Sequence, residues 1–211
     1  RSEKEKKGNL ALGSIYTLTN DIIEFHNIIN KNQFRDSTDN LLQTNSNSNI
    51  VDRIDLLFEK MLLKNKVFSE QLGSLAKSDD NHKQSDFSPA ELQRLWIEIR
   101  LSYGKIPSEE VNKLFEAFYQ KALILNRFIA NESGLILDPD LDSYYLMDIS
   151  VLVMPKMQIE IGKIINIICS SYATGMIQEY DVNKVKLILD ILYEENVQRI
   201  EQGISTSIRE D

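Results

Sequence analysis

A single aspartate lies on the apolar face of a predicted helix in the segment 138–155. Asp148 follows Tyr144 by four residues and Tyr145 by three, so the three side chains share one helical face. A carboxylate on a buried face needs a cation or several hydrogen-bond donors, because burying an unpaired charge is costly. Tyrosine hydroxyls beside such a carboxylate can orient a small polar ligand. We therefore predict that Asp148 points inward and forms a ligand-binding site with Tyr144 and Tyr145.

Two kinds of partner could neutralise Asp148. One is a cation of the chain, for which Arg127, Arg100 and Arg94 are the candidates, and the other is a bound ligand. In the first case the aspartate forms a satisfied ion pair in the core, and the tyrosines only pack around it. In the second case it marks a sensing site. We take Arg127 as the cation that completes such a site.

A histidine near the N-terminus is a further candidate. His26 directly follows Phe25 in the apolar seam of the first predicted helix. A histidine in that position either packs within the bundle or contacts a ligand and responds to pH. The candidate ligand-binding residues are therefore Tyr144, Tyr145, Asp148, Arg127 and His26.

Residues suited to catalysis or metal binding are scarce in this sequence. His26 and His82 are the only histidines, and they are too far apart to form a helical metal pair. The acidic run 138–142 resembles a calcium loop, but Pro139 and the missing glycine and distal glutamate break that pattern, so helix capping explains it better. Nucleophile-elbow, phosphate-loop and dinucleotide motifs do not occur. We expect no enzyme activity, no metal and no cofactor in this segment.

Composition and charge exclude further classes of function. The chain has 24 Lys and Arg against 32 Asp and Glu, and the net charge of -8 disfavours nucleic-acid binding. Cys169 is the only cysteine, so no intrachain disulfide can form, and its apolar neighbours indicate a buried side chain. No stretch approaches the roughly 18 apolar residues of a membrane span. The chain begins at Arg1 without methionine or a signal-peptide pattern, and we interpret it as a segment of a longer protein.

Apolar residues recur at helical spacing along the chain, and no alternating β pattern competes with them. The residues that begin, bend or end the predicted helices are Ser88, Pro89, Gly104, Pro107, Gly134, Asp138, Pro139, Pro155, Gly175 and Asp181. Helices are predicted over about 9–42, 51–72, 88–103, 108–133, 138–171 and 181–208.

These elements predict an all-α fold, an antiparallel helical bundle of about six helices with long N- and C-terminal helices. The first and last helices should lie side by side and bring both chain ends to one pole. We expect one domain over residues 1–211, or two modules with a break in the polar run near residues 77–88. Apolar residues of the last helix extend beyond this packing and predict a homodimer; they are Val197, Ile200, Ile204 and Ile208.

One stretch of the chain resembles a known family. The motif consists of Leu137-Asp138-Pro139-Asp140 and Ser143-Tyr144-Tyr145-Leu146-Met147-Asp148, with Pro155 seven residues later. It resembles the extracytoplasmic helical sensor domains of bacterial transmembrane receptors, which include methyl-accepting chemotaxis proteins, sensor histidine kinases and diguanylate cyclases. That family usually carries an earlier His-Arg-Gly-like element, and Glu24-Phe25-His26-Asn27 stands at the corresponding place without the arginine.

This resemblance implies a periplasmic ligand-sensing domain that is held in the inner membrane by flanking spans outside this segment. Binding of a small polar ligand would displace helices and signal to a cytoplasmic output module. Dicarboxylates, nitrate-like anions and amino acids all remain open as ligands, and the output module is equally open. The alternative is a cytoplasmic helical module that binds partner helices, in which Asp148 is only structural.

Overall fold

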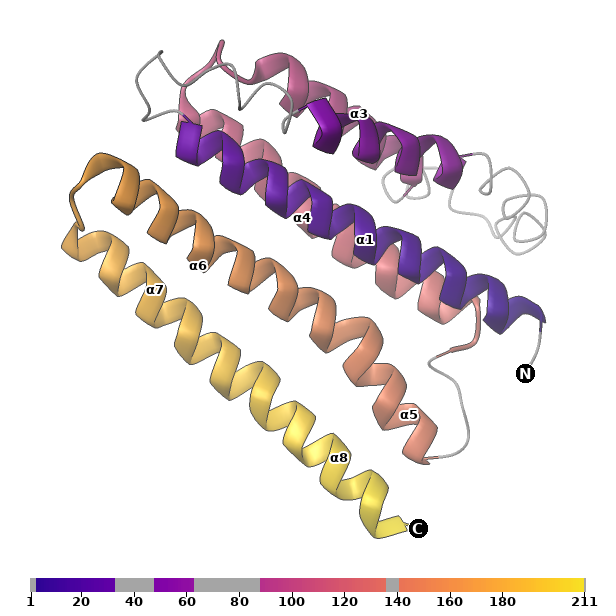
Figure 1. Cartoon of the computed structure of the whole chain (residues 1–211). Coiled ribbons are helices and arrows are strands. Elements are labelled where there is room, and N and C mark those ends of the chain that lie inside the picture. The colour runs from indigo at the N-terminus through magenta and orange to yellow at the C-terminus, as the bar shows by residue number, and fades with distance from the viewer. Residues whose placement is uncertain (1–2, 33–47, 63–87, 136–140, 211) are drawn as a thin grey trace, which may run out of the picture. The chain divides into compact units, whose positions relative to one another are not determined.

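The computed structural model describes residues 3–32, 48–62, 88–135 and 141–210 of the chain (Figure 1). Every regular element within these ranges is helical. The elements are α1 (Glu3–Asn32), a helix over residues 48–62, α3 (Pro89–Ser102), α4 (Ser108–Glu132), α5 (Leu141–Asp148), the π-helical segment η2 (Ile149–Val153), α6 (Met154–Thr174), α7 (Glu179–Ile191), the π-helical segment η3 (Leu192–Val197) and α8 (Gln198–Glu210). The predicted all-α helical bundle is confirmed.

Local signals in the sequence explain several helix ends. Ser88 precedes α3, and its side-chain oxygen accepts a hydrogen bond from the Glu91 backbone N–H at 3.2 Å, with Pro89 at the first helical position. Gly175 ends α6 with a φ of 66°, a left-handed conformation that glycine adopts without steric cost. The prediction that Asp181 caps the last helix is wrong, because α7 already begins at Glu179 and Asp181 lies in its first turn.

Several predicted boundaries lie outside the described residues, including the helix ends near residues 42 and 72. The helix start at Asp138 falls in the undescribed range 136–140, and α5 is described from Leu141. The proposed break near residues 77–88 also lies outside them, apart from Ser88, so it stays a prediction.

The helices form two compact units. Unit 1 contains residues 1–17 and 55–135, and unit 2 contains residues 18–54 and 136–211. In unit 1 an aromatic core joins the helix over residues 48–62 to α4, where the rings of Phe58 and Phe118 meet edge to face with centroids 6.5 Å apart. Trp96 of α3 is fully buried and donates from its indole nitrogen to Asp55 at 2.7 Å. The core of unit 1 therefore includes one satisfied polar contact.

Unit 2 holds two long helices in an antiparallel pair. The first runs through α5, η2 and α6, and the second returns through α7, η3 and α8, so that α5 lies along α8 and α6 along α7 (Figure 1). The second half of α1 packs in parallel along α6, because Asn20 contacts Gln158 and, two turns later, His26 contacts Asn166. Between these contacts Gly162 allows a close approach, since a Cβ placed there would lie 2.6 Å from the Ile23 side chain.

Candidate functional site

Asp148 binds a cation of the last helix in unit 2. Arg199 donates from Nε to Asp148 Oδ2 at 2.8 Å and from Nη2 to Oδ1 at 2.5 Å. This two-bond geometry matches a guanidinium to a carboxylate and is the strongest form of such a pair. The Asp148 side chain is only 10 % exposed, whereas that of Arg199 is 52 % exposed. The predicted inward orientation of Asp148 is therefore confirmed.

A π-helical segment begins directly after Asp148. Within η2 the backbone N–H of Met154 bonds to the carbonyl oxygen of Ile149, five residues back instead of four. Pro155 explains this change, because it has no N–H to give to Val151 and its ring would clash with that carbonyl in a regular helix. The sequence predicted a bend at Pro155, and the structure has a wider, π-helical turn directly before it.

The returning helix carries a second π-helical segment. In η3 the backbone N–H of Gln198 bonds to the carbonyl oxygen of Tyr193, again five residues back. Glu195 of η3 forms an ion pair with Lys156 at the start of α6. Two ion pairs therefore cross between the helices around η2 and η3, one at Asp148 and one at Lys156.

Asn196 of η3 lies between Glu195 of η3 and Arg199 of α8, which take part in these two ion pairs. Its side chain is buried at 2 % exposure, and its Nδ2 has no hydrogen-bond acceptor among the described residues. A buried donor without a partner costs about 1–3 kcal/mol. Asn196 is therefore an energetically unfavourable group at the point where the helices widen.

The two tyrosines of the motif occupy different environments. Tyr145 is half-buried and faces α8, where a Cβ added to Gly203 would lie 3.5 Å from its ring. Tyr144 is 39 % exposed, and the two rings meet edge to face with centroids 5.5 Å apart. Tyr145 and Asp148 thus both pack toward α8, while Tyr144 remains open to solvent.

His26 belongs to a separate polar cluster of unit 2. It is 6 % exposed, and its Nε2 lies 3.1 Å from Nδ2 of Asn166 on α6. Because an amide nitrogen can only donate, Nε2 must be the acceptor and carries no proton in this arrangement. The side-chain oxygen of Asn166 in turn accepts from Asn30. His26 is thus part of a buried amide network between α1 and α6.

The arginines expected beside Asp148 lie in unit 1 instead. Arg127 is exposed on α4, and the structure assigns no bond between it and Asp148. Arg100 pairs with Asp55 at 2.6 Å. The partner of Asp148 is Arg199, which sequence reasoning missed. Its signal was available, because Leu192, Asn196, Arg199 and Gly203 follow at spacings of four, three and four residues on one face.

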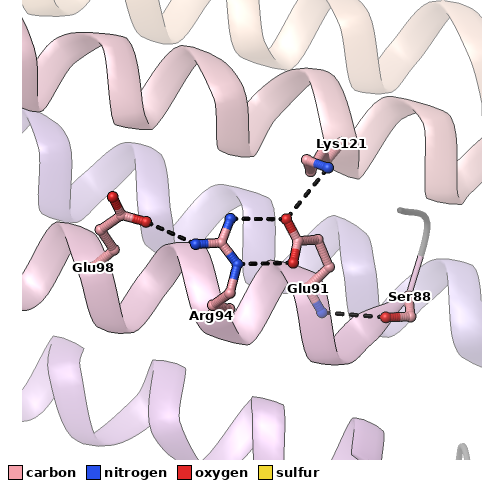
Figure 2. Close-up of polar contacts among 5 residues, drawn as sticks. All are labelled: Ser88, Glu91, Arg94, Glu98 and Lys121. Atoms are coloured by element: carbon pink, nitrogen blue, oxygen red, sulfur yellow. Dashed lines mark hydrogen bonds and ion pairs between the residues drawn. The ribbon is translucent and has the colours of Figure 1, made fainter. Parts of the chain in front are cut away.

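Arg94, the third candidate, belongs to a cluster on the surface of unit 1 (Figure 2). It binds Glu91 through two bonds of 2.9 Å and Glu98 through a third of 2.9 Å, while Lys121 approaches Glu91 to 3.3 Å. The hydrogen bond from Arg94 lowers the pKa of Glu91 from 4.5 to about 2. Glu91 also lies in the first turn of α3, so this cluster fixes the start of that helix.

Among the described residues, no group of three or more His, Cys, Asp or Glu side chains is arranged to hold a metal ion. None of the described helices is both long and apolar enough to cross a bilayer. Cys169, expected to be buried, is half-exposed on α6.

The chain matches no protein family model, no curated protein and no solved structure. What the site can do follows from its own chemistry. Arg199 uses Nε and Nη2 for Asp148, and its half-exposed guanidinium has further N–H donors on Nη1. These remaining donors are groups from which a small anionic or polar molecule can accept hydrogen bonds.

Proposed function

We propose that this chain is the ligand-sensing extracytoplasmic domain of a bacterial transmembrane receptor, of the chemotaxis-receptor or sensor-kinase type. In this proposal the segment is periplasmic, is held at the inner membrane by flanking spans and acts as a homodimer. The observation that carries the proposal is the bond between Asp148 and Arg199. It joins the helix with the receptor-like motif to the last helix of unit 2, and so gives the motif a mechanical connection.

The proposed mechanism uses helix displacement. A small polar ligand binds beside Tyr144 and Tyr145 and competes for the guanidinium of Arg199 or shares it with Asp148. Because Arg199 is on α8 and Asp148 ends α5, a change in their bond alters how α8 lies along α5. A ligand that favours one of two helix positions shifts their populations by its difference in affinity. Arg199 takes the role expected of Arg127, and no catalytic step or cofactor is involved.

A thermal-shift screen of the purified segment against small metabolites tests this proposal. A ligand that binds only the folded state at 100 times its dissociation constant adds about 2.7 kcal/mol of stability. Arg199→Gln and Asp148→Asn should abolish the shift produced by a hit. Lys113→Gln serves as the control, since it removes an exposed ion pair of unit 1 and should leave the shift intact.

Three outcomes separate the proposals. A hit lost in Arg199→Gln but kept in Lys113→Gln supports the sensor. A hit lost only in Arg127→Ala or His26→Gln would place the ligand elsewhere and overturn the assignment to Asp148 and Arg199. The absence of any hit, together with a parent gene that lacks apolar spans on both sides of this segment, would overturn the receptor itself.

One observation favours the alternative, a cytoplasmic helical module that binds other proteins. The turn between α6 and α7 exposes a cluster of large apolar side chains, the α6–α7 turn cluster: Tyr172 (84 % exposed), Met176 (64 %), Ile177 (76 %) and Tyr180 (69 %). Contiguous exposed apolar groups are typical of interaction surfaces. The sequence that flanks this segment in its parent gene decides between the two functions.

A further inference from the structure

The two π-helical segments lie at matching places in unit 2. Both η2 and η3 interrupt otherwise continuous helices, and each contacts the opposite helix near the interruption of its partner. Each such segment holds one more residue than a regular helical turn. An extra residue in a regular helix would rotate everything after it by about 100°, so the wider turn absorbs the residue and keeps both flanking helices in register.

Buried residues continue along one face through both segments. In the first helix they include Val151, Val153, Pro155 and Ile159. In the second helix they are Ile188, Leu192 and Asn196, spaced four residues apart. The wider turns therefore keep the helices before and after them packed on the same side.

The two segments have different causes. Pro155 accounts for η2, because it lacks the N–H that would bond to Val151 and its ring would clash with the Val151 carbonyl in a straight regular helix. No proline lies in or directly after η3, whose sequence is Leu192-Tyr193-Glu194-Glu195-Asn196-Val197. No proline therefore requires η3 in the way that Pro155 requires η2, and the contacts of η3 with the other helix are the remaining candidates.

Two ion pairs hold η3 in this form. Arg199, two residues after η3, is bonded to Asp148, and Glu195 within η3 is bonded to Lys156. Asn196 destabilises this form, because its Nδ2 is buried without an acceptor among the described residues. Conversion of η3 to a regular helix would rotate α8 by about 100° relative to α7, and would carry Asn196 and Arg199 away from their present places.

We propose that η2 and η3 form a two-state joint, in which α8 switches between its present register and one rotated by about 100°, and in which the Asp148–Arg199 and Lys156–Glu195 pairs hold the present register. This switch would supply the helix displacement of the proposed sensor, so its biological use rests on that proposed function. The switch itself requires no ligand. A ligand screen without hits therefore does not contradict the switch, and an α8 that keeps one register does not contradict ligand binding.

Deletion of one residue tests whether η3 contains one residue more than a regular helix would need at this place. Removing Glu194 turns η3 into a regular helix that keeps both α7 and α8 on their present faces, so helix content and melting temperature should be retained. Removing Asp190 from the regular helix α7 rotates the rest of the chain, and the melting temperature should fall by many degrees. If both deletions lower the melting temperature equally, η3 contains no such extra residue and the proposal is overturned.

Spin-label distances then test the two registers. In a Cys169→Ser background, labels at Ile165 and Gln202 report across the joint, and labels at Ile165 and Lys186 report on one side of it. All three positions are exposed. Combining Asp148→Asn with Lys156→Gln should split the first distance into two populations and leave the second unchanged. Adding the Glu194 deletion should restore one population.

A single unchanged distance across the joint after loss of both ion pairs would overturn the proposal. If the double variant does not fold, Lys156→Gln alone serves, because its ion pair is exposed and its loss does not leave a buried charge. The second population should then appear at a smaller fraction. Its absence in folded Lys156→Gln protein at high salt, which weakens the remaining pair, would equally contradict the joint.

Discussion

Arg199 and Asp148 are 51 residues apart in sequence and form two hydrogen bonds, of 2.8 and 2.5 Å. Their surroundings are unequal, because the aspartate side chain is 10 % exposed and the arginine side chain 52 % exposed. Removing one residue of this ion pair therefore has a different effect from removing the other. A lone Arg199 can turn to water, whereas a lone Asp148 remains in the protein without a cation.

The first prediction concerns this asymmetry. Arg199→Met should lower the free energy of unfolding by about 2–3 kcal/mol, because it leaves a buried carboxylate without its cation. Asp148→Asn should cost about 1 kcal/mol or less, since the amide can still accept a bond and Arg199 is half-exposed. Urea unfolding followed by circular dichroism measures both. Equal losses for the two variants would contradict the assigned burial.

The second prediction concerns acid stability. The pKa of Glu91 is lowered from 4.5 to about 2 by the hydrogen bond from Arg94 (Figure 2). A carboxyl with a lower pKa in the folded state stabilises the fold above its unfolded value, and this contribution is lost as the pH falls from about 4.5 to about 2. The melting temperature should therefore decline over that range, and Glu91→Gln should make the decline shallower.

The control for this acid transition is Glu98→Gln. Glu98 binds the same arginine at 2.9 Å, but from a more exposed position, 46 % against 19 % for Glu91. The slope of melting temperature against pH between 4.5 and 2 should stay as in the unsubstituted protein. A shallower slope in Glu98→Gln than in Glu91→Gln would show that Glu91 is not the group responsible.

The helices were predictable because each has its own local signals. The Ser88-Pro89 start and the Gly175 end are properties of a few neighbouring residues, and both are found in the structure. The inward orientation of Asp148 followed from the helical period alone. The start of α7 was misjudged by two residues, because Glu179 supplies the same first-turn acidic signal as Asp181.

The site was less predictable because it depends on how distant helices meet. The choice of Arg127, Arg100 or Arg94 as partner of Asp148 considered only charge, and all three lie in unit 1. The spacing of Arg199 from Asn196 and Gly203 put it on the packed face of its helix, but the fold-back of α8 along α5 that brings it to Asp148 is specified by no local pattern. Neither π-helical segment was predicted. Pro155 indicated only a bend near η2, and no proline lies in or directly after η3.

The third prediction uses two glycines of α1 as a matched pair. A Cβ at Gly8 would lie 2.3 Å from the Ser133 side chain, whereas a Cβ at Gly13 would meet nothing within 4 Å. Alanine is favoured over glycine in a helix by about 1 kcal/mol. Gly13→Ala should therefore raise the melting temperature, and Gly8→Ala should lower it because Ser133 must move. The same sign for both would contradict the close approach of α1 to Ser133.

The fourth prediction concerns the buried amide network between α1 and α6. Asn166 bonds to both His26 and Asn30, so Asn166→Leu removes a donor and an acceptor from two buried side chains. The expected loss in free energy of unfolding is about 2 kcal/mol or more, since each group left unsatisfied costs about 1–3 kcal/mol. Asn183→Leu on the exposed face of α7 is the control and should change stability by less than about 0.5 kcal/mol. If Asn166→Leu is as mild as its control, the amides exchange their bonds for water and the network does not stabilise the packing of α1 on α6.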